Sequence, residues 1–160
     1  MTSRNYLEIH VVDVRPPLIA VCKEFLGPYE RTSDYVGEVQ SYLGRQGRPY
    51  HPEQVLSIHF DRPREQPPEA LRSFQGVFVD GPIQVQEPYF LYRLEGRYVQ
   101  ACIRADQPEQ YAAAYAALLA YASSNGLNVI SETGIQVTLL EGEQAYLEIY
   151  LELGAAPSPA

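Results

Sequence analysis

One pattern of predicted elements occurs twice along this chain and limits the folds open to it more than any other feature. In each copy, two strand-like runs precede an amphipathic stretch and two more follow it. The first copy comprises Tyr6–Val14, Leu18–Phe25, the helical stretch Arg31–Gln46, Val55–Asp61 and Phe74–Asp80. The second comprises Ile83–Arg93, Tyr98–Arg104, the helical stretch Pro108–Ser124, Ile135–Glu141 and Tyr146–Leu153. This order predicts an α+β fold of duplicated β-β-α-β-β units, with an antiparallel sheet, two helices on one face and a ligand groove on the other.

The two copies align in register. Gly47 and Gly126 each follow a helical stretch as a C-terminal stop, and placing one glycine on the other maps Leu18–Phe25 onto Arg97–Arg104. The chain ends in a run of small and proline residues without periodicity. We therefore expect one domain at residues 1–153, with pseudo-repeats at 6–80 and 83–153, and a flexible tail at 154–160.

Both helical stretches have the apolar spacing of a helix that buries one face. In the first stretch the apolar positions are Tyr35, Val36, Val39, Tyr42 and Leu43. In the second they are Tyr111, Tyr115, Leu118, Leu119 and Ala122. Each helix should therefore lie on the sheet.

The balance of charge argues against nucleic acid as a direct partner. The chain has 12 Lys and Arg against 20 Asp and Glu, a net charge of -8, and such a surface repels phosphate backbones.

The N-terminus has no apolar signal region, and the longest run of small apolar residues, Ala112–Ala122, is too short to cross a bilayer. We expect a cytoplasmic protein without a membrane partner.

No motif of a conventional enzyme or metal site occurs in the sequence. It has no Ser/His/Asp order, no Gly-rich phosphate loop and no cluster of His and Cys ligands, so we expect neither a metal nor a cofactor. Cys22 and Cys102 are expected to be buried, reduced thiols, with a single disulfide between them as the alternative. His59 lies on the polar face of a strand, where a histidine is more often a surface or hydrogen-bonded residue than a catalyst.

Side chains alternate between the two faces of a strand, and the last predicted strand separates cleanly. The face expected to receive the helices carries Leu147, Ile149, Leu151 and Leu153. The other face carries Tyr146, Glu148, Tyr150 and Glu152. The same alternation adds to it Tyr98, Gln100, Cys102 and Arg104 from the sixth strand, and Phe74, Gly76 and Phe78 from the fourth. The free face is therefore aromatic, with a carboxylate among the rings.

An aromatic face of this kind suits a small-molecule pocket, because tyrosine provides contact area and a polar tip at low entropic cost. The predicted ligand-binding residues are Tyr98, Tyr146, Glu148, Tyr150, Phe74 and Phe78. Glu148 would neutralise a bound cation while each ring face attracts it by roughly 0.5–2 kcal/mol. The alternative is that the tyrosines merely cover a sheet edge and that Glu148 is solvated.

The chain resembles the GyrI-like small-molecule-binding family in three segments: Gly27-Pro28-Tyr29-Glu30, Asp61-Arg62-Pro63 and Pro67-Pro68-Glu69-Ala70-Leu71-Arg72-Ser73. The resemblance covers nearly the whole chain and implies the duplicated arrangement, a ligand between the halves and a ligand-facing carboxylate on the final strand, a position that Glu148 matches. Members are effector-binding domains of multidrug-sensing transcription regulators or stand-alone proteins. Without a preceding helix-turn-helix, this chain resembles the stand-alone members.

Three hypotheses for the function follow. The favoured one is a stand-alone binding protein that senses or sequesters an apolar, cationic or polycyclic compound. The second, implied by the resemblance to some stand-alone relatives, is a hydrolase of reactive cyclopropane-containing, DNA-alkylating compounds, with Glu148 and Tyr146 as catalytic residues. The third, a protein-interaction module acting on a topoisomerase, rests on the resemblance alone and leaves a protein partner open.

Overall fold

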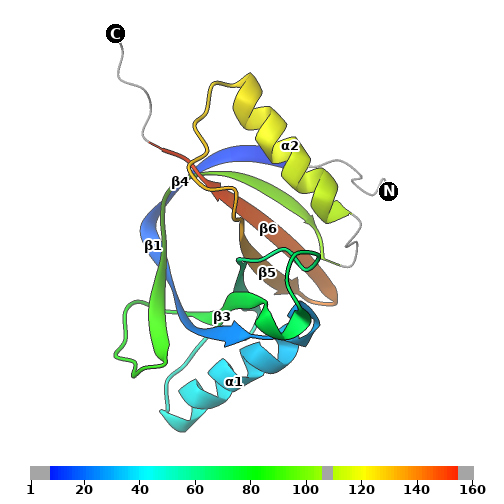
Figure 1. Ribbon diagram of the computed structural model, residues 1–160. Coiled ribbons are helices and arrows are strands. Elements are labelled where there is room, and N and C mark those ends of the chain that lie inside the picture. The colour runs from blue at the N-terminus through cyan, green and yellow to red at the C-terminus, as the bar shows by residue number, and fades with distance from the viewer. Residues whose placement is uncertain (1–7, 106–109, 155–160) are drawn as a thin grey trace.

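The computed structural model describes residues 8–105 and 110–154 as strands that curve around one interior, with two helices outside them (Figure 1). The strands are β1 (Glu8–Leu26), β2 (Gln54–His59), β3 (Arg72–Val79), β4 (Tyr89–Arg104), β5 (Ile135–Glu141) and β6 (Gln144–Glu152). The helices are α1 (Thr32–Arg45) and α2 (Gln110–Ser124), with short 3₁₀ turns η1 (Tyr29–Arg31) and η2 (Pro68–Ala70). The predicted α+β class is confirmed.

The described strands form a closed antiparallel barrel in the order β1-β3-β2-β5-β6-β4. The long strands β1 and β4 close it. They pair with each other from Glu8 opposite Cys102 to Lys23 opposite Tyr89, while β1 also pairs with β3 and β4 with β6. Closure removes unpaired strand edges. The antiparallel sheet with helices on one face agrees with the prediction, but its closure was not predicted: the face away from the helices is the inside of a barrel.

The first two strands expected in each copy are a single strand in the structure. In β1 the pairing with β4 shifts register between Val14 and Leu18, where the prolines at 16 and 17 have no N–H to donate to the ladder. In β4 the strand begins only at Tyr89, so the first part of the expected run Ile83–Arg93 is not strand. Each half thus has the order strand, helix, strand, strand; the internal duplication itself stays a prediction.

Both helices pack on the outer face of the barrel, and Figure 1 shows them on opposite sides of the strands. All five apolar positions predicted for α1 are buried, and they pack against outward residues of β1 and β3 such as Val21 and Val77. On α2, Leu118 and Ala122 are buried as expected together with Ala114, while the remaining predicted positions pack partly buried on the same cluster. The helices therefore leave the inner face of the barrel uncovered.

The predicted helix stops are confirmed by the backbone. Gly47 and Gly126 have φ of 66° and 64°, a left-handed conformation that glycine adopts without steric cost and that commonly ends helices. In the part of the chain that the structure describes, neither helix has the length and apolar character needed to span a membrane. The predicted tail lies almost wholly outside the described residues, which end at Gly154.

Candidate functional site

The inner face of the β4–β6 pair carries the polar side chains that the alternation predicts. The outward residues of this pair pack under α2, whereas its inward tyrosines belong to the cluster inside the barrel. Across the pair, Gln100 lies opposite Tyr150, and Cys102 lies opposite Glu148. These four side chains therefore share one patch of the interior wall.

Glu148 is held by a closed triangle of hydrogen bonds. The Tyr150 hydroxyl donates to Glu148 Oε1 at 2.9 Å, and Gln100 Nε2 donates to Glu148 Oε2 at 3.0 Å. Gln100 Nε2 also donates to the Tyr150 oxygen at 2.9 Å. Both carboxylate oxygens are thus oriented by neutral donors, which fixes the carboxylate without neutralising its charge.

The interior changes the acid–base properties of this patch. Burial raises the pKa of Glu148, although the hydrogen bonds from Tyr150 and Gln100 oppose this shift. Burial, followed by the Glu148 charge, raises the pKa of Tyr150, and the same two causes raise the pKa of Cys102. The phenol and the thiol therefore stay protonated at neutral pH.

The structure brings Tyr98 to this patch but not Tyr146. The Tyr98 ring is 3% exposed and meets Tyr150 edge to face at 5.6 Å, while its hydroxyl donates to the Glu95 carbonyl at 2.9 Å. Tyr146 shares the inner face, but it lies opposite Arg104 and Leu139 and takes no part in the hydrogen bonds of Glu148. The amide of Gln100, and not the Tyr146 hydroxyl, is the second hydrogen-bond donor to Glu148 beside Tyr150.

Phe74 and Phe78 lie on the face away from the helices, as the alternation predicts, and this face is the inside of the barrel. Phe78 is buried, and Phe74 meets Phe60 at 4.7 Å and Phe90 at 4.8 Å, both edge to face. Tyr92 joins the same cluster, and burial raises its pKa to about 12. Phe60, Phe90 and Tyr92 were not predicted as site residues, although the alternation along Ile83–Arg93 could have indicated the last two.

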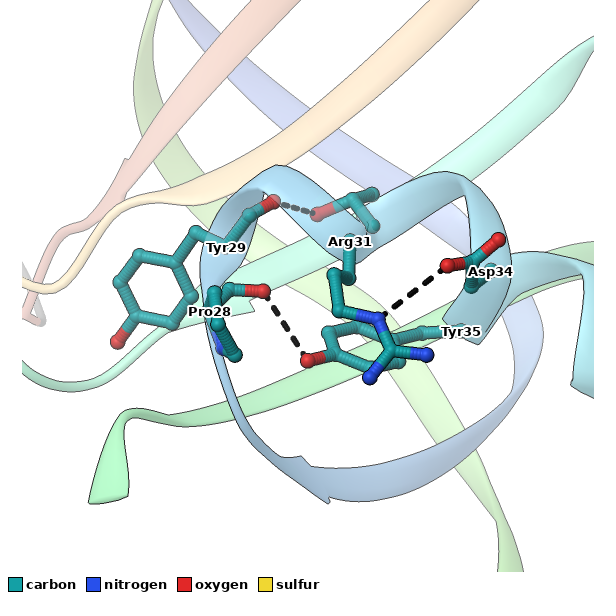
Figure 2. Close-up of polar contacts among 6 residues, drawn as sticks. Pro28, Tyr29, Arg31, Asp34 and Tyr35 are labelled. Atoms are coloured by element: carbon teal, nitrogen blue, oxygen red, sulfur yellow. Dashed lines mark hydrogen bonds and ion pairs between the residues drawn. The ribbon is translucent and has the colours of Figure 1, made fainter. Parts of the chain in front are cut away.

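The Gly-Pro-Tyr-Glu turn positions one aromatic ring on the outside of the barrel. The Tyr35 hydroxyl holds the turn by donating to the Pro28 carbonyl at 3.0 Å (Figure 2). Thr32 Oγ1 also donates to the Tyr29 carbonyl, at 2.8 Å. The Tyr29 ring points away from Tyr35 (Figure 2) and stacks on His59 at 4.1 Å. The turn thus connects η1 to the end of β2.

A second polar layer lies on the outer face of the β2–β3 pair. Ser57 Oγ donates to Gln75 Oε1 at 2.6 Å, and the Gln75 amide contacts His59 Nε2 at 3.2 Å. Two adjoining hollows of about 720 and 800 Å³ border this layer and share His59, Asp61, Arg62, Pro63 and Tyr111. The sequence analysis did not predict this groove, although Ser57 and His59 on β2 and Ser73 and Gln75 on β3 alternate with apolar or glycine positions.

The cysteines and acidic residues form no metal site in the described part of the chain, where no three His, Cys, Asp or Glu side chains are arranged to hold an ion. Both cysteines are free thiols, with Cys22 buried and Cys102 half-buried. Burial raises the pKa of Cys22. Neither thiol is therefore activated as a nucleophile.

Comparison with known proteins identifies the family of this chain and several solved structures with a similar fold. A family model described as "GyrI-like small molecule binding domain" matches residues 8–153. The fold is similar to that of the EcmrR C-terminal domain, with a TM-score of 0.68 and 12% identity over 94% of this chain and 99% of that one. It also matches EcmrR in a complex with DNA (TM-score 0.67, 10% identity), covering 94% of this chain and 58% of that one.

A structure titled as a hydrolase from Listeria innocua is similar as well, with a TM-score of 0.57 and 13% identity over 94% of both chains. None of the curated proteins matches this sequence. At these identities, the solved structures establish the fold, and the residues of the site must be argued from their own chemistry.

Proposed function

The chain belongs to the GyrI-like small-molecule-binding domain family, and we propose that it binds an apolar cation inside the barrel, where Glu148 neutralises the positive charge. One observation carries this proposal: Glu148 is half-buried, both of its hydrogen-bond donors are neutral, and it forms no ion pair with a described residue. Withdrawing a carboxylate from water without a counter-charge is unfavourable. A bound cation would supply that counter-charge.

The aromatic residues around Glu148 favour a cation with apolar substituents. Tyr98 and Tyr150 stand beside the carboxylate, and a row of phenylalanines lines the same interior cluster, with Phe60 and Phe74 from the first half and Phe90 from β4. Ring faces attract a desolvated cation and provide apolar contact area. The expected ligand is therefore a lipophilic monocation that carries aromatic groups.

Calorimetric titration with tetraphenylphosphonium tests the proposal. Wild-type protein should bind it, and Glu148→Gln should weaken binding at least about tenfold, because the variant keeps the shape of the side chain but removes its charge. Glu143→Gln, which makes the same charge change on an exposed turn, is the matched control and should bind like wild type.

The neutral compound triphenylphosphine oxide distinguishes the contribution of the ligand's charge to the affinity from that of its aromatic rings. Wild-type protein should bind it more weakly than it binds tetraphenylphosphonium. Glu148→Gln and Glu143→Gln should bind it with about equal affinity. If Glu148→Gln binds tetraphenylphosphonium as tightly as wild type does, the proposal is wrong.

A second candidate function, hydrolysis of a cyclopropane conjugated to a carbonyl group, is favoured by the contact between Glu148 and Tyr150. Water would attack a ring carbon while its proton passes to Glu148; the ring C–C bond breaks and its electrons move to the carbonyl oxygen, which Tyr150 protonates. The proton then returns from Glu148 to Tyr150 across their 2.9 Å hydrogen bond. In this mechanism Tyr150 replaces Tyr146 as the partner of the carboxylate.

Mass spectrometry distinguishes binding from turnover. A hydrolase converts a cyclopropane-fused electrophile into a product heavier by one water, with many turnovers per protein, and Glu148→Gln abolishes the conversion. Stoichiometric binding without product would overturn the enzymatic proposal and leave the binding proposal intact. The topoisomerase-directed interaction stays a prediction from family resemblance.

A further inference from the structure

The triangle of hydrogen bonds around Glu148 uses all the donors of the two side chains that orient it. Gln100 Nε2 carries two N–H groups: one donates to Glu148 Oε2 at 3.0 Å and the other to the Tyr150 oxygen at 2.9 Å. The single O–H of Tyr150 donates to Glu148 Oε1 at 2.9 Å. The Cys102 thiol, opposite Glu148 on β4, is a weak donor. A ligand at this patch therefore meets mainly hydrogen-bond acceptors.

The same network fixes the orientation of the Gln100 amide. If the amide were turned round, Oε1 would face the Glu148 carboxylate without a proton between them. With Nε2 in that contact, Oε1 makes no hydrogen bond to a described residue. Gln100 is half-buried, and Oε1 is not enclosed by protein atoms. The Gln100 carbonyl is thus an open acceptor beside the carboxylate.

One nitrogen atom can reach both acceptors. Gln100 Oε1 lies no more than about 5.6 Å from Glu148 Oε2, because a single amide group and a hydrogen bond of 3.0 Å join the two atoms. A nitrogen that donates to each oxygen at about 2.8 Å, the usual length of a charge-assisted hydrogen bond, spans this separation. A protonated amine with at least two N–H groups can therefore bind Glu148 and Gln100 together, whereas a fully alkylated nitrogen has no proton for either.

Among the described residues near this patch, carboxylates outnumber basic groups. Glu8 lies on the same inner face at the start of β1, and the charge of Glu141 also acts on Glu148. The basic groups are Arg104, whose guanidinium donates to a glutamine at 2.8 Å, and His10, whose Nε2 atom lies 3.8 Å from the Glu8 carboxylate. This balance favours a positive ligand but does not distinguish one kind of cation from another.

We propose that the interior site selects cations that donate N–H groups, namely primary ammonium and amidinium ions with aromatic substituents, and that Gln100 Oε1 is the specificity-determining acceptor. This inference rests on the proposed binding of a cation beside Glu148. Glu148 attracts cations with and without N–H groups, and Gln100 adds a hydrogen bond to those that have them. Quaternary cations therefore bind by charge and ring contacts alone.

Two ligands that differ only in methylation of the nitrogen test the proposal by calorimetric titration. They are 4-phenylbenzylammonium, with three N–H groups, and its N,N,N-trimethyl derivative, with none. The quantity to compare is the ratio of their affinities, ammonium over trimethylammonium. Gln100→Leu removes the acceptor and should lower this ratio about tenfold, as expected for one hydrogen bond to a charged group.

Tyr150→Phe is the matched control. It also takes one hydrogen-bond donor from Glu148, but it keeps Gln100 Oε1. It should therefore weaken the binding of both ligands and leave the ratio of their affinities unchanged. If Gln100→Leu fails to unfold cooperatively in urea, Gln100→Met, which has nearly the length of glutamine, takes its place with the same expected result.

The outcomes separate this inference from the proposed function. A ratio that is unchanged in the folded Gln100 variant, or that falls equally in Tyr150→Phe, would overturn the N–H selection, as would the absence of binding by both biphenyl ligands. If tetraphenylphosphonium still binds in a way that depends on Glu148, the cation site stands without that selection. If Glu148→Gln binds all three cations as tightly as wild type does, both proposals are wrong.

Discussion

The strand pairs β2–β3 and β4–β6 place their polar side chains on opposite sides of the barrel wall. On β2–β3 the outward positions hold Ser57, His59, Ser73 and Gln75, and the inward positions hold Leu56, Ile58, Gly76 and Phe78. On β4–β6 the inward positions hold Gln100, Cys102, Glu148 and Tyr150, and the outward positions hold Val99, Ala101, Ile149 and Leu151. Each pair therefore has one polar layer, and only the inner layer contains a carboxylate.

A close approach of backbones leaves one inner position of the first half without a side chain. Gly76 lies opposite Cys22 on the inner face of β1–β3, as Glu148 lies opposite Cys102 on β4–β6. A Cβ atom on Gly76 would come within 2.0 Å of the Val21 carbonyl oxygen, so no side chain fits there. At this position the first half contributes no side chain to the interior, whereas the second half contributes the Glu148 carboxylate.

The largest expected effect concerns this pair of positions. Gly76→Ala should destabilise the protein by at least about 3 kcal/mol, because backbone atoms must move to admit the methyl group. Glu148→Ala should change the free energy of unfolding by less than about 1 kcal/mol, since it removes a half-buried charge along with its hydrogen bonds. Urea unfolding measures both, and equal losses in the two variants would contradict the comparison.

The outer layer should lose stability in acid. Burial lowers the pKa of His59 to about 4 in the folded state, whereas an unfolded chain binds the proton near pH ~6.5. Between these values the unfolded state takes up more protons, so the free energy of unfolding falls with decreasing pH, by about 2–3 kcal/mol in total. His59→Phe should remove this dependence, measured by urea unfolding at several pH values. If the free energy of unfolding falls with pH equally in wild type and in His59→Phe, the pH dependence arises from other groups and the prediction is wrong.

The inner layer should respond to pH with the opposite sign. Burial raises the pKa of Glu148, so the folded state retains this proton at pH values where the unfolded chain has lost it. The contribution of Glu148 to stability therefore falls as pH rises from the ordinary carboxyl pKa through the raised one, and affinity for a cation rises over the same range. The change should be smaller than that of His59, because two hydrogen bonds to Glu148 oppose the shift. A stability difference between wild type and Glu148→Gln that does not vary with pH would contradict this assignment.

Local patterns predicted both helices and the last two strands of each half, but neither the continuity of β1 and β4 nor the closure of the sheet. Apolar spacing identified the buried face of α1, Gly47 and Gly126 identified the helix stops, and alternation sorted the faces of β6 correctly. The pairing of β1 with β4 joins residues far apart in the sequence, and no local period encodes it. The prolines at 16 and 17 also interrupt the pattern of β1 without ending the strand.

The same limit applies to the two polar layers. Alternation along single strands placed Tyr98, Glu148 and Tyr150 on the inner face, where the structure brings them together. It could not show which neighbour across the strands meets the carboxylate, and so favoured Tyr146 over Gln100. The outer layer depends entirely on contacts between strands, because Ser57, Gln75 and His59 become a network only when β2 pairs with β3.

The smallest expected effect separates the two tyrosines predicted beside Glu148: Tyr146, expected to be its catalytic partner, and Tyr150, which donates a hydrogen bond to it. Tyr150→Phe keeps the ring but removes the hydroxyl that donates to Glu148, and should weaken tetraphenylphosphonium binding about threefold to fivefold, since the carboxylate loses one donor that orients it and favours its ionised form. Tyr146→Phe removes a hydroxyl from the same face and strand and should leave the affinity unchanged. Calorimetric titration of both variants decides between them. A loss of affinity in Tyr146→Phe without one in Tyr150→Phe would mean that the ligand contacts Tyr146, and that the triangle of Glu148, Tyr150 and Gln100 does not form the cation site.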